Sequence, residues 1–167
     1  MTASAKKLLL AFFSFLLIAS GFARHGGTEG YKKAFGVRGG PLYGLTFKDF
    51  VAPRCAIELI AGQEWKGYSL TALFEYEKEF LSANSWFWIV GGGLCGGAYR
   101  EQYYFQGSNY ATNGTFLGAP GVAGIIGIEY RVRVIPLTIT LDFKPYVLYP
   151  ASRNPYDAAL SLRYIFK

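Results

Sequence analysis

The strongest constraint on the fold is a regular alternation of apolar and polar residues in the stretch 129–145, EYRVRVIPLTITLDFKP. Successive side chains of a β-strand point to opposite faces, so this alternation predicts strands with one apolar and one polar face. A turn signal at 132–136 divides the stretch into two strands. The polar positions are Glu129, Arg131, Thr138, Thr140, Asp142 and Lys144, and the apolar positions are Tyr130, Val132, Ile135, Leu137, Ile139, Leu141 and Phe143.

The same period of two runs through almost all of the chain after residue 30, and helical periodicity is hard to find. The stretch 34–50 fits either one long strand or a hairpin. Closed bacterial barrels have an even number of strands and the other segments supply six, so a hairpin is favoured. The predicted strands are 33–40, 43–50, 55–65, 68–79, 86–98, 121–132, 135–145 and 156–166. Most are separated by short turns, and two longer breaks fall at 100–120 and 147–155.

The first residues form a separate segment. Two lysines precede an apolar run over 8–18, and a small residue, Ala23, follows shortly after it. This is the pattern of a secretory signal peptide that is cleaved after Ala23. An uncleaved membrane anchor is the alternative, although a spanning helix needs about 20 apolar residues. We therefore expect a signal peptide over 1–23 and one domain over 24–167.

Charge and composition exclude several functions. The formal charge of +6 falls to +4 without the two lysines of the signal peptide, and tracts of Lys and Arg are absent, so we expect no nucleic-acid partner. The one histidine, His25, lies at the predicted new N-terminus, a poor place for a catalytic base. Cys55 and Cys95 fall on opposite faces of the predicted sheet, which excludes a disulfide and gives no metal-ligand set. We predict no catalytic residue, no metal and no cofactor.

The polar face of the predicted sheet is both charged and rich in glycine. Its charged residues are Lys48, Glu58, Glu75, Glu129, Arg131, Asp142 and Arg163, and its glycines include Gly62, Gly91, Gly93 and Gly127. Eight strands enclose a space barely wide enough for side chains, where glycine leaves room for a large charged neighbour. These charges therefore predict an ion-paired plug inside a barrel, mostly in its periplasmic half. An ion or proton path is the functional alternative.

The apolar face carries aromatic residues near the strand ends, as the two interfacial girdles of a membrane barrel would. Trp86, Trp88, Tyr164 and Phe166 fall at one end, and Trp65, Tyr68 and Phe143 fall at or near the other. The alternative is that these are ordinary core aromatics. With both chain ends periplasmic, the two long breaks become surface loops and most short turns become periplasmic, which is the usual division.

The long break 100–120 is rich in aromatic residues set among Gln, Ser and Asn. They are Tyr103, Tyr104, Phe105, Tyr110 and Phe116. Exposed aromatics among small polar residues are typical of adaptable binding surfaces, so an extracellular ligand at this loop is one expectation. The alternative is that the rings pack on one another or extend the upper girdle.

Several segments together resemble the small outer-membrane β-barrel domain proteins of Gram-negative bacteria, an eight-stranded, porin-like or opacity-like group. The segments are FGVRGG, GLTFKDF, AIELI, TALFEYEKEF, WFWIVGGG, and GIIGIEYRV followed by IPLTITLDFKP. The final YIFK resembles the C-terminal aromatic signal of such barrels, which implies contact with the barrel-assembly machinery through Tyr164 and Phe166. Lys167 departs from the commonest form, in which the aromatic residue is last. The resemblance implies an architecture and supplies no chemistry.

The sequence therefore predicts an exported, eight-stranded antiparallel transmembrane β-barrel of the outer membrane, in contact with its lipid. The expected role is structural or interactive, in cell-envelope integrity or surface contact through 100–120. Two alternatives stay open: an integral outer-membrane lipid-modifying enzyme, and a soluble periplasmic lipid-binding calyx. A calyx would reverse the faces, with apolar side chains inside and polar ones outside.

Overall fold

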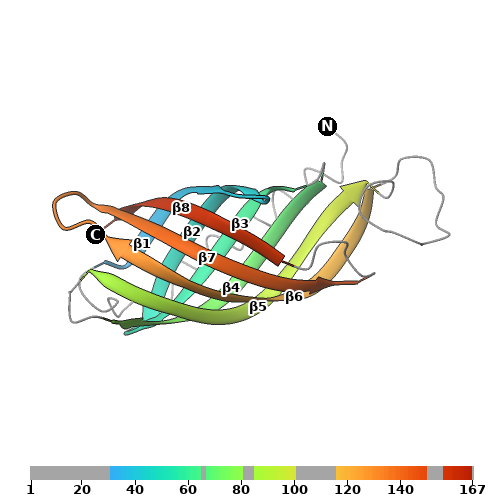
Figure 1. Ribbon diagram of the computed structural model, residues 1–167. Coiled ribbons are helices and arrows are strands. Elements are labelled where there is room, and N and C mark those ends of the chain that lie inside the picture. Colours follow the sequence, from blue (N-terminus) through green and yellow to red (C-terminus); the bar gives the residue numbers. More distant parts are fainter. Residues whose placement is uncertain (1–30, 65–66, 81–84, 101–115, 150–155, 167) are drawn as a thin grey trace.

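The computed structural model describes residues 31–64, 67–80, 85–100, 116–149 and 156–166. They form an all-β fold in which eight antiparallel strands close into one barrel (Figure 1), which confirms the predicted eight-stranded antiparallel barrel. The strands are β1 (Lys33–Gly39), β2 (Tyr43–Ala52), β3 (Cys55–Glu64), β4 (Gly67–Glu79), β5 (Trp86–Arg100), β6 (Phe116–Arg131), β7 (Leu137–Leu148) and β8 (Tyr156–Phe166). Within these residues, no helix has the length and hydrophobicity needed to cross a membrane.

The strands follow one another around the barrel in chain order, and β8 pairs with β1 to close the ring. At this seam Lys33 lies opposite Phe166, and Gly39 lies opposite Leu160. Each strand therefore has a partner on both sides, so backbone groups along the wall pair within the sheet. The stretch 34–50 is a hairpin, as the even strand number favoured, because β1 and β2 pair up to Arg38 opposite Gly44.

The largest departure from the expected boundaries is at the β5–β6 hairpin. Its pairing continues to Arg100 opposite Phe116, so β6 begins at 116 and not at 121. Gly118, Pro120 and Gly121 suggest a loop, but the pairing with β5 carries β6 through Pro120. Its carbonyl still accepts a hydrogen bond from the Tyr149 N–H at 2.8 Å. The break predicted over 100–120 is therefore shorter, and its residues 101–115 lie outside the described part.

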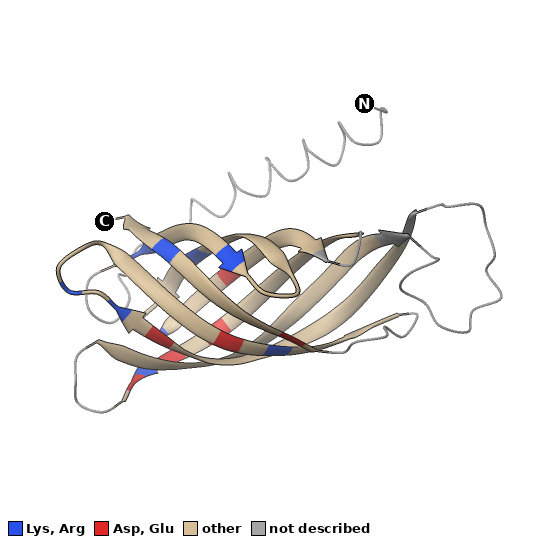
Figure 2. Cartoon of the chain, turned by 45° about the horizontal axis from the view of Figure 1, so that its top comes forward, with Lys and Arg blue, Asp and Glu red and all other residues tan. Residues whose placement is uncertain are grey.

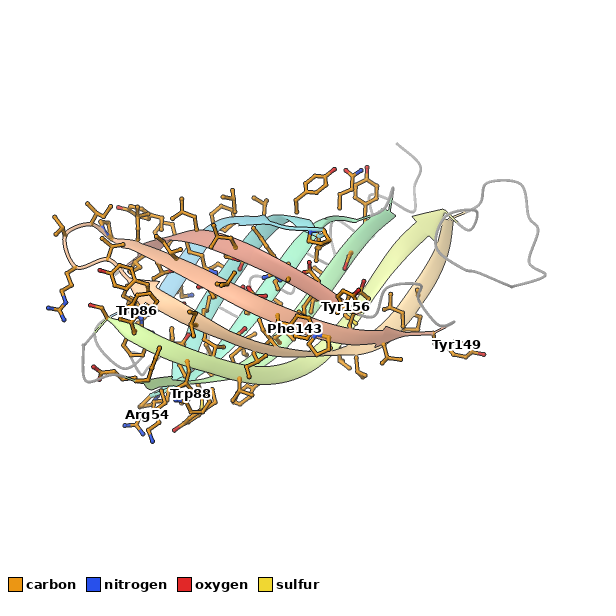
Figure 3. The ribbon with its side chains drawn as sticks, in the orientation of Figure 1. Arg54, Trp86, Trp88, Phe143, Tyr149 and Tyr156 are labelled. Atoms are coloured by element: carbon orange, nitrogen blue, oxygen red, sulfur yellow. The ribbon has the colours of Figure 1, made fainter. Side chains whose placement is uncertain are left out.

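Side chains alternate across the wall as the sequence pattern predicts (Figure 3). In β7, Leu141 and Phe143 are 55% and 44% exposed on the outside, whereas Asp142 between them is 3% exposed and points inward. Ile139 is also exposed on the outside, and Glu129 is fully buried. Apolar side chains therefore cover the outer wall, and charged side chains fill part of the lumen.

The two ends of the lumen differ in chemistry. Charged residues gather towards the end that carries the β2–β3 and β6–β7 turns, here called the short-turn end, and are sparse towards the opposite, long-hairpin end (Figure 2). There, the buried inward side chains form an apolar cluster of Leu42, Ile60, Leu73, Ala119, Ala123, Ile125, Tyr146 and Leu148, with Cys95 packed against it. The expectation of a polar lumen is therefore correct for only part of its length. Towards the long-hairpin end, the side chains of this cluster occupy part of the lumen.

Candidate functional site: an ion-paired lumen

A network of buried ion pairs fills the lumen towards the short-turn end. Its centre is Lys48 of β2, whose Nζ lies 2.7 Å from Glu75 Oε2 and 3.6 Å from Glu129 Oε2 and also pairs with Glu77. All four side chains are fully buried. The inward positions of β2, β4 and β6 converge here because the barrel is only eight strands wide.

Arg131 of β6 forms the side of this network nearest the short-turn end. Its Nε donates to Glu129 Oε1 at 2.9 Å, and its Nη2 pairs with Glu77. The guanidinium lies over the Phe87 ring, 3.7 Å from its centroid, and 4.7 Å from the centroid of Tyr31. Such stacking suits a planar, delocalised cation that has lost most of its water.

Arg163 of β8 forms the opposite side. It pairs with Glu58, lies 3.5 Å from Glu129 Oε2, and is fully buried. Its remaining donors reach hydroxyl groups, Nε to Thr46 Oγ1 at 3.0 Å and Nη1 to Thr140 Oγ1 at 2.7 Å. These additional hydrogen bonds help to make a buried charge tolerable.

A second, smaller cluster lies further along the lumen. Arg38 of β1 donates to both carboxylate oxygens of Asp142, at 2.7 and 2.6 Å, and to Asp157 Oδ2 at 2.9 Å. Lys144 lies 3.7 Å from Asp157. The forked geometry matches a planar carboxylate, which makes this a strong, oriented pair.

The short-turn end is covered by aromatic rings. Tyr31 and Phe50 pack edge to face with centroids 5.0 Å apart, and Phe87 lies beneath Arg131. Tyr31 donates its hydroxyl to Glu129 Oε1 at 2.9 Å. Burial raises the pKa of Tyr31 well above its usual range, so the phenol remains a proton donor. These rings separate the ion pairs from solvent.

The structure places all seven predicted charged residues inside the lumen with ion-pair partners. Six belong to the main network, and Asp142 belongs to the second cluster. Four partners were missed as site residues: Arg38, Glu77, Lys144 and Asp157. Glu77 lies near a turn in the sequence, where a solvated strand end would be expected, but β4 runs to Glu79 and Glu77 is fully buried. Arg38 lay in the ambiguous stretch, where its face was not assigned.

Two of the inward glycines lie against residues that carry carboxylates, although the atom nearest an added Cβ is a backbone carbonyl oxygen, of Phe74 at Gly91 (2.4 Å) and of Leu141 at Gly127 (2.7 Å). A Cβ on Gly91 would lie 3.0 Å from Glu75 Cα and 3.2 Å from its Cγ. A Cβ on Gly127 would lie 2.8 Å from Asp142 Cβ. Gly62 and Gly93 instead lie closest to the carbonyl oxygens of Tyr43 and Ala72 and adjoin Leu42 and Leu73 of the apolar cluster, not the charges.

The outer wall carries aromatic residues towards both ends of the barrel. At the short-turn end, Trp86 contacts Tyr130 with centroids 4.8 Å apart, and Tyr76 contacts Trp88 at 5.7 Å. Towards the other end, Phe143 stacks on Tyr156 at 6.1 Å (Figure 3). The remaining predicted girdle residues in the described part, Tyr68, Tyr164 and Phe166, are exposed on the outside.

Several predicted residues lie outside the described part of the chain. They are Tyr103, Tyr104, Phe105 and Tyr110 of the aromatic loop, Trp65, His25, and the signal peptide over 1–23. Phe116, assigned to the loop, is the first residue of β6. Cys55 lies on the outer face and Cys95 packs against the apolar cluster inside, so they are on opposite faces as expected. In the described ranges, no group of three His, Cys, Asp or Glu side chains is arranged to hold a metal ion.

A scan against protein-family models found no match, and a search of the curated proteins found none. What the chain does is therefore inferred from its own residues and geometry. The geometry has two main features: an outer wall of exposed apolar side chains and a lumen closed by ion pairs and apolar side chains.

Proposed function

We propose that this chain is a transmembrane β-barrel of the outer membrane with a structural or surface-interaction role, and that its lumen is plugged. One observation carries the proposal: all eight strands expose large apolar side chains on the outside while ionised side chains are buried inside. Examples from successive strands are Val37, Leu45, Ile57, Leu70, Leu94, Ile126, Leu141 and Leu160, which are 40–69% exposed.

This distribution favours lipid over water as the surrounding medium. Apolar surface in water is unfavourable by about 25 cal/mol for each Å². Soluble monomers rarely expose apolar patches larger than a few hundred Å², and here the apolar surface encircles the molecule. A closed barrel also pairs its wall backbone groups internally, as hydrocarbon requires. A soluble calyx would need the faces reversed.

The aromatic residues support the same orientation. Trp86, Trp88 and Tyr164 lie on the outer wall near the short-turn end, where interfacial rings meet lipid headgroups. Strands β2 and β3 have 10 residues each, within the length of about 9–11 residues expected for a tilted membrane strand. On the outer face of β8, the ring centroids of Tyr164 and Phe166 lie 5.2 Å apart. We propose this pair as the contact for the barrel-assembly machinery.

A plugged lumen follows from its contents. The ion-pair network spans the lumen from β2 to β6 and β8, and the apolar cluster fills the lumen towards the other end. Eight strands leave little free bore beyond such side chains. Purified protein in planar lipid bilayers should therefore give no large, steady current. Wide-pore currents would contradict the plug and leave the membrane orientation intact.

The direct test of the proposal is cell fractionation combined with gel mobility. We expect the mature protein, cleaved after Ala23, in the outer-membrane fraction. A folded barrel should run differently in unheated and boiled samples, because sodium dodecyl sulfate does not unfold it without heat. Mass spectrometry reports the cleavage site. Recovery in the soluble periplasmic fraction, without heat-dependent mobility, would contradict the proposal.

The surface-interaction role rests on the aromatic loop that follows β5. Deleting 103–116 should leave the barrel folded, because the charged network and the seam between β1 and β8 do not involve this segment. Any adhesion or ligand-binding phenotype of the intact protein should be lost in the deletion. Replacing the same residues by a Gly-Ser linker of equal length controls for loop length. A barrel that fails to assemble in both variants would contradict a surface role for the loop.

A further inference from the structure

The charges buried in the lumen do not balance. In the described part of the chain, the main network holds three cations, Lys48, Arg131 and Arg163, and four carboxyl groups, Glu58, Glu75, Glu77 and Glu129. The second cluster is balanced, with Arg38 and Lys144 facing Asp142 and Asp157. An uncompensated buried charge is strongly unfavourable, so one carboxyl group of the main network needs an additional positive partner.

The contacts locate the surplus carboxyl group. Glu77 forms ion pairs with Lys48 and Arg131. Glu129 forms ion pairs with the same two residues and accepts a hydrogen bond from Tyr31. By contrast, no donor in the described residues reaches Glu58 Oε2 or Glu75 Oε1, although both side chains are fully buried.

Glu58 and Glu75 are also neighbours on the inner wall. Glu75 lies opposite Ala56 in the β3–β4 pairing, so it is diagonal to Glu58 on the inner wall, within reach of a side-chain hydrogen bond. Two ionised carboxylates cannot form such a bond, because both only accept. A hydrogen bond between their orphan oxygens therefore requires a proton on one of them.

From this geometry we propose that Glu58 and Glu75 form a proton-binding site, in which one shared proton neutralises the surplus charge of the lumen. Arg163 and Thr46 hold Glu58 in the ionised, accepting role. Glu75, whose one cationic partner among the described residues, Lys48, is shared with Glu77 and Glu129, carries the proton and donates it. The binding reaction is the reversible addition of H⁺ to the Glu75 carboxylate, with no other bond changed.

The surroundings of the pair favour retention of this proton. Above it, Ile60 and Leu73 belong to the apolar cluster, and beside it Gly91 of β5 carries no side chain. The remaining titratable and charged neighbours are those of the main network, with Asp142 already bound to Arg38. An apolar boundary disfavours a second carboxylate charge at this point. The inference depends on the inward side chains alone, so it does not require the outer wall to face a membrane.

Infrared spectroscopy of the folded barrel in heavy water provides the test, because protonated and ionised carboxyl groups absorb separately. At neutral pH the wild type should show the band of a protonated carboxyl group, and alkaline titration should convert it to carboxylate. Glu75→Gln and Glu58→Gln should each lose the band, because either leaves three carboxylates facing three cations. Asp49→Asn should keep it, because Asp49 pairs with Lys33 outside the main network.

Urea unfolding gives a second readout that does not depend on the spectrum. Glu75→Gln should keep the wild-type midpoint, since an amide can donate to Glu58 as the acid does. Glu77→Gln should lower the midpoint, because it removes a carboxylate that Lys48 and Arg131 both contact. Absence of the protonated band in folded wild type, or its persistence in both Gln variants of the pair, would overturn the proposal. Stabilisation by Na⁺ or K⁺ without that band would also overturn it, because a metal cation would then hold the site.

Discussion

Replacing Arg38 by methionine should be among the most damaging single changes to the barrel. The Arg38, Asp142 and Asp157 side chains have no exposed surface. Without the guanidinium, the described residues offer Asp142 no other ion pair, and Asp157 retains only Lys144, at 3.7 Å. Removing one partner of a buried pair costs about 3–5 kcal/mol, because a buried charge is left uncompensated. Methionine fills a similar volume, so lost packing contributes little.

Lys33→Met on the same strand is the matched control. Lys33 pairs with Asp49 at 3.2 Å, but its side chain is 32% exposed, so this pair is screened by solvent and contributes about 0–1 kcal/mol. Both variants can be refolded into detergent micelles and unfolded in urea, with the folded fraction read from gel mobility. Adding Asp142→Asn to Arg38→Met should recover part of the loss. Equal midpoints for the two single variants would refute the assignment of Arg38 to a buried, water-excluded pair.

Three further substitutions test the wall and the lumen. Leu141→Arg should destabilise the barrel in lipid vesicles by up to about 2–4 kcal/mol if the site lies near the bilayer midplane. Urea titration measures this loss of stability, and a negligible loss would argue against a lipid-facing Leu141. Gly91→Ala should reduce the refolding yield, because its Cβ would lie 2.4 Å from the Phe74 carbonyl oxygen and 3.0 Å from Glu75 Cα. Gly92→Ala on the outer face, with its nearest atom at 3.4 Å, should refold like wild type, and equal yields would contradict the crowding. Tyr31→Phe removes one hydrogen bond to Glu129 and should lower stability by about 1–2 kcal/mol without changing the barrel's gel mobility.

The strand assignments followed from sequence because the signal is local. A strand's two faces alternate residue by residue, so 129–145 predicts which side chains share a face without any knowledge of their partners. Leu141, Asp142 and Phe143 lie on the expected faces. The predicted start of β6 was wrong for the converse reason. Pro120 indicates a break locally, but its strand is extended by pairing with β5, which no local signal reports.

The sequence predicted most residues of the candidate site but not which of them form ion pairs with one another. Lys48, Glu75 and Glu129 were recognisable because charged residues on the polar face of a strand must lie in the lumen of a narrow barrel. Glu77 was missed, because its burial depends on Tyr31 and Phe50, which pack together at the end of the lumen. These rings come from the start of the described chain and from β2, 46 and 27 positions away from Glu77.

The order of residues along the chain specified the period of two, the number of strands and the inward direction of the charges, because each depends on neighbours within a few positions. The closure of the strands into a barrel determined which side chains meet in the lumen. Arg38 meets Asp142 across 104 positions, and Arg163 meets Glu58 across 105. Such contacts arise only when all strands surround the same axis. The same holds for the apolar cluster in one part of the lumen and for the surplus carboxyl group in the other part. Side chains distant in sequence then compete for the same small space, and their neighbours are set by register and not by local pattern.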